Sequence, residues 1–471
     1  MKGITGWQYR PFVPMERPAE RGQPAICRLA PDETSVEVEI VDDSAESTTY
    51  TLHVRPRGGD DAEPWTIMDL DGLNTRVDGL RREQDYELFV TRQGDPQARS
   101  RTRLVRTGAY PDHVVNYAHP EDDVYGFSGR YLCDPALVRL PSGALLAGMS
   151  VFEGHGPQNL SLLFRSDDDG DSWRYVCDLF PAYWGTLFLN RGVLYFLGTH
   201  TENGHVLIGA SHDEGRTWTA PTILFVGGGG PDTCGYQRQP MPILEHQGRL
   251  ITSVDYGSWK SPTCYGIGTL SVDADADLLD PANWTVSEIT YFDPDWPGAP
   301  VGGNVSVLEG SVYVASDGRL VNLTRMQIRG AEPAHSLACL FELDPDDLES
   351  APRFLKIIDM PTGANSRTHV LRDEVSGRYW AIGNLVTNDA TPHMRTVVGL
   401  CVSDDGYGWR VAKIVLDYRD EDPARVGLQY TSFIVDGDDI LHLTRTSING
   451  AHNFHDANCQ TFGVVTNFRS L

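Results

Sequence analysis

The sequence is poor in basic residues and lacks long apolar runs. It has 39 Lys and Arg residues against 65 Asp and Glu residues, and its net charge at pH 7 is −26. An acidic surface repels phosphate backbones and anionic lipid headgroups. No apolar run approaches the roughly 20 residues that a membrane-spanning helix requires. Neither nucleic acid nor a membrane is therefore an expected partner.

The eight cysteines also show no pattern. They are scattered along the chain, with no Cys-x-x-Cys pair. Dispersed thiols in a large domain are usually small buried hydrophobes. Residues 1–7 lack the apolar stretch of a secretory signal peptide. We therefore expect a cytoplasmic protein with reduced thiols.

The sequence motifs that would indicate a metal or cofactor site are missing as well. The sequence has no His-Glu-x-x-His motif and no EF-hand loop. Asp273, Asp275 and Asp277 alternate, which would place them on one face of a strand, although a solvated turn is the commoner explanation. The sequence thus predicts no certain cofactor, and a structural calcium ion is compatible with it without being required.

What the sequence does contain is typical of a turn-rich all-β protein. It has 47 Gly and 29 Pro among 471 residues, and 10% of its residues are aromatic. Residues 166–173 read Ser-x-Asp-x-Gly-x-x-Trp, residues 211–218 repeat the pattern, and residues 403–409 carry a shortened form. Ser and Asp side chains tie a turn to its own backbone, and Gly supplies the left-handed conformation. The spacing of 45 residues between Ser166 and Ser211 fits one four-stranded propeller blade per repeat.

This pattern resembles the Asp-box of the sialidase superfamily, whose members are β-propellers. The resemblance covers residues 111–471 and implies a propeller there. The Asp-box lies far from the active site in that superfamily, so it implies a fold and no particular reaction.

Residues 1–110 differ from the rest of the chain. Period-two alternation at 35–41 and 49–55, with further strands near 65–68 and 86–90, predicts a small β-sandwich. Residues 80–86 resemble the turn into a late strand of fibronectin type III domains. We expect an ancillary domain at 1–110 and a catalytic propeller at 111–471.

Six inner strands are expected in the propeller, starting near residues 133–137, 183–187, 238–242, 302–305, 367–370 and 429–432. They predict six blades, and the weak middle repeats leave seven open. The final strand, near 460–468, needs a partner from residues 114–125 to close the ring.

Candidate site residues lie where these inner strands start, because such side chains point into one central mouth. Arg, Tyr and amide groups there suit a sugar bearing a carboxylate, which Arg can hold bidentately. The alternative is that many of them only satisfy local backbone groups. The expected catalytic residues are His455, Tyr430, His369, Arg238 and Arg367, and the expected substrate-binding residues are Arg130, Tyr131, Asp134, Tyr183, Trp184, Gln237, Asn304 and Gln429.

Three phrases, at 240–242, 427–430 and 455–458, resemble a group of sialidase-like bacterial and fungal propellers that includes L-rhamnose-α-1,4-D-glucuronate lyases. True sialidases instead carry an Arg-Ile-Pro phrase on the first inner strand, and this chain has Cys133-Asp134-Pro135 there. Arg130 lies five residues before Pro135 rather than two. This departure argues against sialidase activity, and no Glu partner for Tyr430 can be assigned.

Three functions stay open. The favoured one is β-elimination on a uronate-containing glycan, with Arg238, Arg367 and Asn304 neutralising the carboxylate. His455 beside Asp456, His369 or Tyr430 would supply the base and the acid, although a His next to an Asp can equally be a loop cap. The second is a glycoside hydrolase of sialidase type, which needs two carboxylates, and Asp134 is the one that can be placed. The third is a glycan-binding propeller without catalysis, using aromatic platforms such as Trp184 and Trp259.

Overall fold

A computed structural model describes residues 22–471 except 43–48, 59–63, 155, 231 and 262–263. Antiparallel sheets make up most of this part of the chain, which also has two single-turn 3-10 helices, at Pro281–Asn283 before β22 (Trp284–Val286) and at Phe468–Ser470 after the last strand. Within the described ranges, no helix is long and apolar enough to cross a membrane. The expectation of an all-β fold is confirmed. The signal-peptide expectation rests on residues 1–7, which lie outside the described residues.

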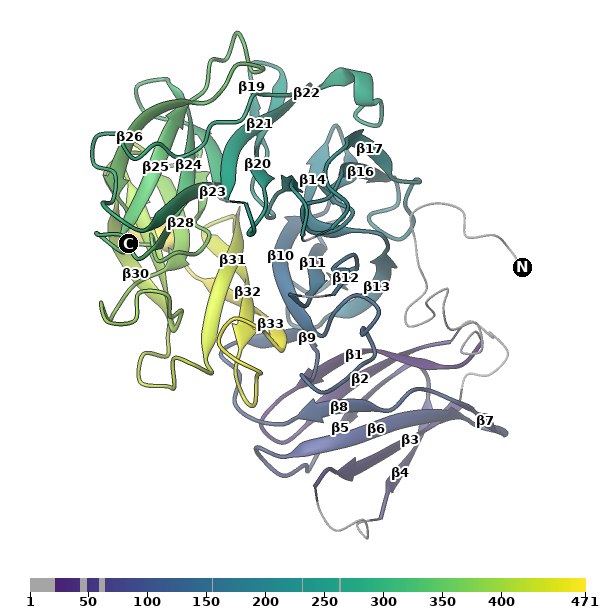
Figure 1. Ribbon diagram of the computed structural model, residues 1–471. Helices are drawn as coiled ribbons and strands as arrows, with labels where there is room; N and C mark the ends of the chain where they lie inside the picture. Colours follow the sequence, from purple (N-terminus) through teal and green to yellow (C-terminus); the bar gives the residue numbers. More distant parts are fainter. Residues whose placement is uncertain (1–21, 43–48, 59–63, 155, 231, 262–263) are drawn as a thin grey trace.

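The N-terminal residues form two sheets that face each other across an apolar core (Figure 1). Tyr50, Leu52 and Val54 alternate with less buried residues along one strand, as the period-two pattern predicts. One sheet has the order β1-β2-β5, and the other has the order β4-β3-β6-β7 with β8 also paired to β6. The strands are β1 (Ala25–Pro31), β2 (Val36–Val41), β3 (Thr49–Pro56), β4 (Thr66–Asp71), β5 (Asn74–Val77), β6 (Asp85–Arg92), β7 (Asp95–Arg99) and β8 (Arg103–Arg106).

Six sheets follow (Figure 1), and the strands pair in chain order in the first, second, fourth and fifth of them. The first two are β10 (Tyr131–Arg139), β11 (Leu145–Phe152), β12 (Ser161–Ser166), β13 (Arg174–Leu179), then β14 (Tyr183–Asn190), β15 (Val193–Thr199), β16 (Val206–Ser211), β17 (Thr222–Phe225). The third has β18 (Gly235–Gln237), β19 (Leu244–His246), β20 (Arg249–Gly257), β21 (Tyr265–Asp273), β22 (Trp284–Val286), and the fourth β23 (Asn304–Val314), β24 (Leu320–Arg329), β25 (Leu337–Glu342), β26 (Arg353–Asp359). The last two are β27 (His369–Arg372), β28 (Tyr379–Asn384), β29 (Val397–Ser403), β30 (Arg410–Asp417), then β31 (Gly427–Asp436), β32 (Asp439–Ser447), β33 (Cys459–Val465) with β9 (His113–Tyr117).

The sheets are arranged around a common centre, which is the architecture of a β-propeller. Inner strands of neighbouring sheets touch: β10 contacts β14, β23 contacts β20 and β27, and β31 contacts both β27 and β10. The second and third sheets are linked by Thr186 of β14, whose hydroxyl donates to the Met241 carbonyl at 3.1 Å. The last contact closes the ring.

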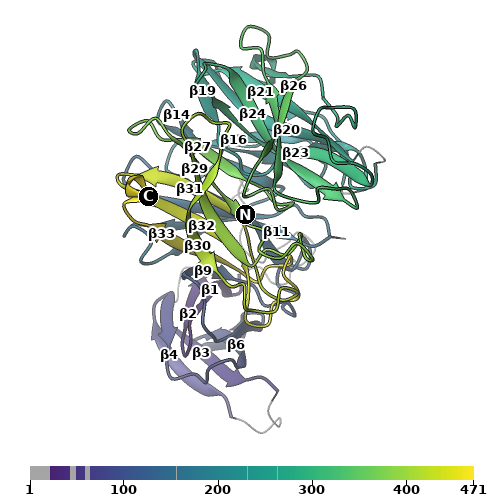
Figure 2. The same ribbon diagram turned by 90° about the vertical axis from the view of Figure 1, so that its left-hand side faces the viewer.

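The closure of the last sheet agrees with the sequence-based expectation. β33 pairs with β9, with Gln460 opposite Asn116 and Cys459 opposite Tyr117. Early and late segments of the chain therefore share one sheet. Figure 2 shows the N-terminal strands on the side of the ring where β9 and β33 lie.

The third sheet departs from the expectation. Residues 238–242 form no inner strand, because they fall between β18 and β19, which both pair with β20. Pro240 and Pro242 interrupt this stretch, and proline cannot donate to a strand ladder.

The repeated turn after β12 and β16 has the same hydrogen bonds in both copies. Ser166 and Ser211 each accept the N–H of the Gly four residues on at 2.8 Å. Asp168 accepts the N–H of Ser172 at 2.9 Å, and Asp213 accepts that of Thr217 at 2.7 Å. The shortened copy keeps the Ser403 to Gly406 bond at 2.9 Å. The motif is a turn device, as its chemistry predicts.

Candidate active site

Four inner strands carry one residue each in the left-handed conformation. These residues are Asp134 in β10, Trp184 in β14, Glu309 in β23 and Tyr430 in β31, with φ between 50° and 56°. The pairing register shifts around each of them, as in a β-bulge. A bulge bends the strand and changes the direction of a side chain. The same local distortion therefore occurs at one place in four sheets around the ring.

A cavity of about 310 Å³ lies among these residues. Its lining is polar and aromatic, with two carboxylates, four arginines and two tryptophans. The lining residues are Phe152, Gly154, Tyr183, Trp184, Glu202, Gln237, Gln239, Trp259, Glu309, Arg325, Gln327, Arg329, Arg395, Tyr430, Arg445 and His455.

The hydroxyl of Tyr430 is held between a cation and an anion. It lies 2.9 Å from Nη1 of Arg325 and 3.4 Å from Oε1 of Glu309. Arg325 and Glu309 form a buried ion pair with Nη1 2.8 Å from Oε2. Burial lowers the pKa of Arg325, but Glu309 and Tyr430 outweigh it and leave that pKa above its ordinary value. The three side chains form a compact triad on the cavity wall.

Glu309 is positioned through its own backbone. Its N–H donates to both carboxylate oxygens of Asp255 at 3.0 Å. Burial raises the pKa of Asp255 well above its ordinary value. Asp255 thus fixes the main chain at the bulge from which the Glu309 side chain extends.

Glu202 is the second carboxylate of the lining. Oε2 accepts from Nε2 of Gln158 at 2.6 Å, and Oε1 accepts from the indole N–H of Trp259 at 3.1 Å. Burial raises the pKa of Glu202, and the two donors oppose this rise. A carboxyl group with a raised pKa can serve as a proton donor near neutral pH.

Three cavity arginines surround the Tyr430 ring. The guanidinium carbons of Arg395 and Arg445 lie 5.1 Å and 5.3 Å from the ring centre, and Arg325 donates to the hydroxyl. The Nε atoms of all three are buried without a hydrogen-bond partner in the described part of the protein. Burial lowers the pKa of Arg395 to about 10, so the group stays cationic at neutral pH. The cavity is a cationic region within an acidic protein.

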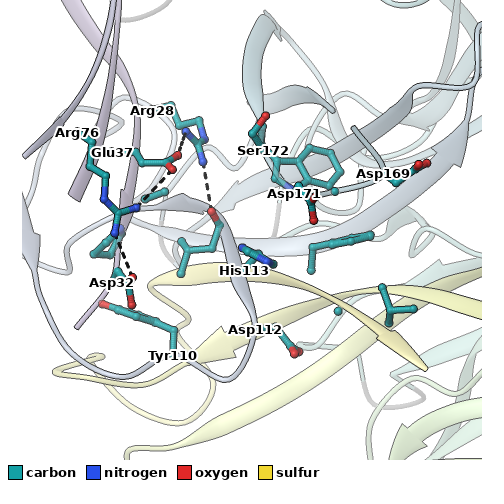
Figure 3. Close-up of a pocket in the computed structure, with 18 residues that line it drawn as sticks. Arg28, Asp32, Glu37, Arg76, Tyr110, Asp112, His113, Asp169, Asp171 and Ser172 are labelled. Atoms are coloured by element: carbon teal, nitrogen blue, oxygen red, sulfur yellow. Dashed lines mark hydrogen bonds and ion pairs between the residues drawn. The ribbon is translucent and has the colours of Figure 1, made fainter. Parts of the chain in front are cut away.

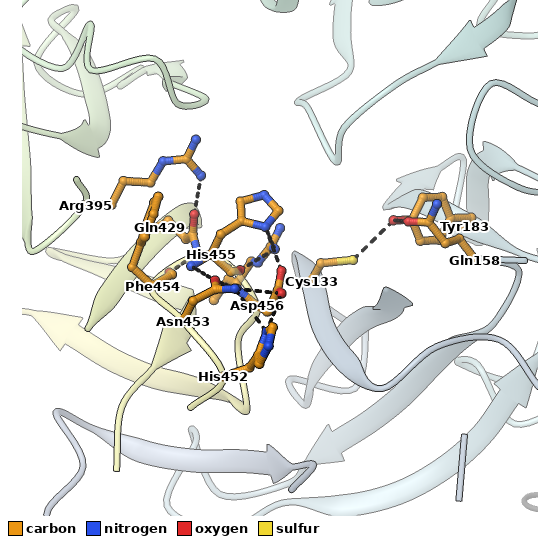
Figure 4. A network of polar contacts seen from close by, with 11 residues as sticks. Cys133, Gln158, Tyr183, Arg395, Gln429, His452, Asn453, Phe454, His455 and Asp456 are labelled. Atoms are coloured by element: carbon orange, nitrogen blue, oxygen red, sulfur yellow. Dashed lines mark hydrogen bonds and ion pairs between the residues drawn. The ribbon is translucent and has the colours of Figure 1, made fainter. Parts of the chain in front are cut away.

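His455 lines the cavity from the loop between β32 and β33. Its Nδ1 lies 2.9 Å from Oδ1 of Asp456, and Figure 4 shows this pair beside His452 and Asn453. Burial and, secondly, Arg445 lower the pKa of His455 to about 4, although Asp456 opposes both. The imidazole is therefore neutral at neutral pH.

The structure brings five of the sequence-predicted residues to the cavity lining. They are Tyr183, Trp184, Gln237, Tyr430 and His455. Asp134 and Gln429 lie directly behind the lining. Oδ2 of Asp134 accepts from Cys133 Sγ at 2.8 Å, and burial raises the pKa of Asp134 to about 7. Gln429 binds Arg395 and donates to the carbonyl groups of Phe454 and His455.

Arg238 and Arg367 lie deeper, outside the lining. Arg238 donates to the Leu197 carbonyl at 2.7 Å and to two threonine hydroxyls, and Arg367 donates to the Pro240 carbonyl at 2.6 Å and to the Tyr430 carbonyl. Both guanidinium groups thus link neighbouring sheets. The His369 ring packs against Phe433, and Arg367 lies nearby. Burial and, secondly, the charge of Arg367 hold the pKa of His369 well below its ordinary value.

The remaining predicted residues do not line the cavity. Tyr131 stacks on His452, Arg130 lies 3.8 Å from Glu153, and Asn304 is exposed at the start of β23. Asp273, Asp275 and Asp277 lie at the end of β21 and in the turn after it, where Asp275 pairs with Arg191. Among the described residues, no group of three His, Cys, Asp or Glu side chains could hold a metal ion.

Sequence reasoning missed Glu202, Glu309, Arg325, Arg395 and Arg445. Glu309 carries a signal in hindsight: a charged residue followed by Gly310 in the middle of an otherwise apolar strand. Arg325 and Arg445 lie on β24 and β32, which carry several other polar residues and so give no such signal. Glu202 and Arg395 lie outside the named strands and carry no comparable sequence signal.

A larger hollow of about 520 Å³ lies where β1 and β2 meet the first and last sheets of the ring (Figure 3). Its two arginines are paired with carboxylates of the same lining: Arg28 with Glu37 at 2.9 Å and Arg76 with Asp32 at 3.3 Å. The smaller central cavity, with its buried arginines and the raised pKa of Glu202, is the better candidate.

No protein-family model and no curated protein matches the sequence. Among solved structures, the chain is similar to a protein of unknown function from Dyadobacter fermentans, with 14% identity and a TM-score of 0.51 over 75% of this chain and 98% of that one. It is also similar to an α-L-arabinanase of Penicillium chrysogenum, with 13% identity and a TM-score of 0.49 over 77% and 99% of the two chains. A Hadza microbial sialidase shares 12% identity, with a TM-score of 0.48 over 98% of both chains. At these identities the likeness concerns the fold and not the activity.

Proposed function

We propose that the protein is a glycoside hydrolase that cleaves a glycan at a negatively charged sugar bound in the central cavity. The observation that carries this proposal is the Tyr430–Glu309–Arg325 triad in a cavity with a second carboxylate, Glu202. The proposal includes a six-bladed propeller at 111–471 and an ancillary β-sandwich at 1–110. The two N-terminal sheets and six later sheets support that division.

The triad supplies the parts of an activated nucleophile. A phenol is a weak nucleophile until its proton is removed, and Glu309 is placed to take that proton. Arg325 would stabilise the resulting phenolate. The phenolate oxygen then attacks the anomeric carbon while the glycosidic bond breaks, and Glu202 protonates the departing oxygen. In the second step, Glu202 takes a proton from water, the water oxygen displaces Tyr430, and the Tyr430 oxygen recovers its proton from Glu309.

The charge of the cavity supports an anionic sugar. The guanidinium groups of Arg325, Arg395 and Arg445 gather around Tyr430, and four arginines face two carboxylates in the cavity lining. Guanidinium groups bind carboxylates through paired N–H donors. A substrate carboxylate in the cavity would therefore be attracted to these cations.

This proposal predicts that Tyr430 becomes covalently attached to the sugar. A fluorinated glycosyl donor that slows release should give an adduct whose mass equals protein plus sugar, located on Tyr430 by peptide mass spectrometry. Glu309→Gln should lower turnover of anionic aryl glycosides by roughly 10²–10⁴-fold, because the general base is lost. Tyr195→Phe, far from the cavity on β15, is the matched control. Full activity in Tyr430→Phe would rule the mechanism out.

β-Elimination on a uronate is the second candidate, because His455 lies on the cavity wall near Arg445. The arginines would acidify the proton beside the carboxylate, and His455 would remove it. Incubation with uronate-bearing oligosaccharides distinguishes the two reactions. Sugar release without ultraviolet absorbance indicates hydrolysis, whereas absorbance from an unsaturated uronate indicates elimination.

A further inference from the structure

Glu202 is held by hydrogen-bond donors from the two sheets that flank its own. It lies in the loop between β15 and β16 of the second sheet. Gln158, in the loop between β11 and β12 of the first sheet, donates to Oε2 at 2.6 Å. Trp259, in the loop between β20 and β21 of the third sheet, donates to Oε1 at 3.1 Å. Each oxygen of the carboxyl group therefore has its own donor.

The amide group of Gln158 has one orientation that suits its surroundings. An ionised carboxylate only accepts hydrogen bonds, so the amide nitrogen must face Glu202. Oε1 of Gln158 then accepts from the Tyr183 hydroxyl at 3.0 Å, and Figure 4 shows these two side chains together. Burial raises the pKa of Tyr183 well above its ordinary value, so the hydroxyl keeps its proton at neutral pH. The bond from Tyr183 thus holds the amide nitrogen toward Glu202.

The main chain that carries Gln158 is itself fixed. Gln158 is fully buried with a φ of 50°, and its N–H donates to the Ser128 carbonyl at 2.9 Å. A left-handed conformation is unfavourable for a residue with a Cβ and persists only where the surroundings impose it. The Thr201 hydroxyl also donates to the Pro157 carbonyl, which joins the residues that precede Glu202 and Gln158. The two loops therefore form one unit around the Glu202–Gln158 contact.

The groups around Glu202 favour its protonated form, and the two donors limit this preference. Burial is the largest cause of its raised pKa, and the charge of Asp232 adds to it, whereas the donors act in the opposite direction. Tyr265 of the third sheet is neutral, because burial raises its pKa well above the ordinary value. The guanidinium carbon of Arg329 lies 5.4 Å from the centre of the Trp259 ring.

We propose that Gln158 and Trp259 are positioning residues that hold the Glu202 carboxyl group in the orientation from which it gives its proton to the departing oxygen. The inference rests on the proposed function, because it takes Glu202 as the proton donor. An ionised carboxylate has about four lone-pair positions, and the two donors occupy one on each oxygen. The transferred proton uses one of the positions that are left. Glu202 loses this proton to the glycosidic oxygen and becomes a carboxylate that both donors already stabilise.

The contact can be followed without substrate through the indole of Trp259. Protein labelled with ¹⁵N-tryptophan is observed by NMR over a range of pH, and Trp259→Phe identifies the Trp259 signal by its loss. In the wild type, this signal should shift as Glu202 ionises, because the indole N–H then donates to a charged acceptor. Glu202→Gln should abolish the shift.

Removing the other donor should change the midpoint of this titration. Gln158→Met should raise the midpoint by about one pH unit or more, because methionine has no N–H to donate to the carboxylate. Gln247→Met is the matched control, since Gln247 also has a φ of 50° but is exposed in the turn before β20, and it should leave the midpoint unchanged. Tyr183→Phe removes a single oxygen and should raise the midpoint by less, because the Gln158 amide is then free to turn.

A midpoint in Gln158→Met equal to that of the control would overturn the proposal. So would an indole signal of Trp259 that is the same in wild type and Glu202→Gln at every pH. If Gln158→Met folds poorly, Tyr183→Phe decides alone, and an unchanged midpoint there has the same meaning.

Turnover separates this inference from the proposed function. With an anionic aryl glycoside, Gln158→Met should lower kcat by about tenfold or more with little change in KM, and the loss should be smaller for an aryl group that departs without protonation. If the NMR shifts are as expected but no glycoside is cleaved, the proposed function fails and the hold on Glu202 stands. If Gln158→Met cleaves both glycosides at the wild-type rate, the positioning role fails alone.

Discussion

At the scale of single residues, four residues at or directly behind the central cavity have an unfavourable backbone conformation. Asp134, Trp184, Glu309 and Tyr430 all adopt positive φ, where a side chain costs roughly 1–2 kcal/mol relative to glycine. Trp184, Glu309 and Tyr430 line the cavity, and Asp134 lies directly behind it. Because all four of these strained residues lie around one cavity, the strain supports a functional reason rather than a purely structural one.

This strain predicts an unusual ranking of variants at Tyr430. Tyr430→Gly should be more stable than Tyr430→Ala by about 1 kcal/mol, because glycine adopts φ near 53° without a Cβ clash. At Leu428, two residues earlier on β31 and fully buried, the Gly variant should be the less stable one. Urea unfolding of the four variants gives the comparison. The same sign at both positions would contradict the assigned backbone conformation.

Asp178 predicts a pH-dependent stability. Burial raises its pKa to about 8, while the Tyr175 hydroxyl donates to it at 2.9 Å and opposes the rise. A folded pKa above the unfolded value near 4 favours folding at low pH. That stability is lost as pH rises from about 4 to about 8, by up to about 1.4 kcal/mol per pH unit. Asp178→Asn should remove this slope in urea unfolding at pH 5 and pH 8, whereas exposed Asp171→Asn should keep it.

At the scale of elements, the Ser–Asp–Gly turns predict stability and not activity. Asp168 and Asp213 each accept hydrogen bonds from a backbone N–H and a hydroxyl in the same turn. Asp168→Ala and Asp213→Ala should each lower the free energy of unfolding by about 1–2 kcal/mol, because these backbone donors lose their partner. Asp171→Ala in the same turn is the control. Loss of turnover without loss of stability would show that the turns serve the cavity directly.

The elements were more predictable than the site. The turn residues after β12 and β16 and the pairing of the last strand with 114–125 could be anticipated, because local chemistry and ring closure determine them. The prediction of an inner strand at 238–242 is wrong, because two prolines in this stretch prevent strand pairing there. Arg325 and Arg445 on two strands and Arg395 in the loop before β29 meet around Tyr430, and no local pattern encodes such a meeting.

At the scale of the whole molecule, buried charges join the N-terminal sheets to the ring. Arg103 on β8 pairs with Asp122 at 2.6 Å and donates to the Ile26 carbonyl of β1. Arg28 on β1 donates to the Val115 carbonyl of β9 at 2.7 Å. The N-terminal sheets therefore contact the very strand that completes the last sheet.

Removing one partner of the buried Arg103–Asp122 ion pair should destabilise the protein strongly. Arg103→Met should cost about 3–5 kcal/mol, since Asp122 is left buried without its cation. Arg101→Met, which breaks the more exposed pair with Asp123, should cost less than about 1 kcal/mol. Thermal unfolding followed by circular dichroism gives both values. Equal losses would mean that the buried pair adds nothing to the junction.

The pairing of β9 with β33 also has a consequence for biosynthesis. Tyr430 and Arg445 belong to the sheet that β9 completes, His455 lies in a loop between two of its strands, and β33 ends at Val465. A nascent chain leaving the ribosome can hold five sheets while the sixth is still unfinished. Catalytic competence should then appear in one step, only after residue 465 has emerged, and shorter translation intermediates should be inert toward sugars.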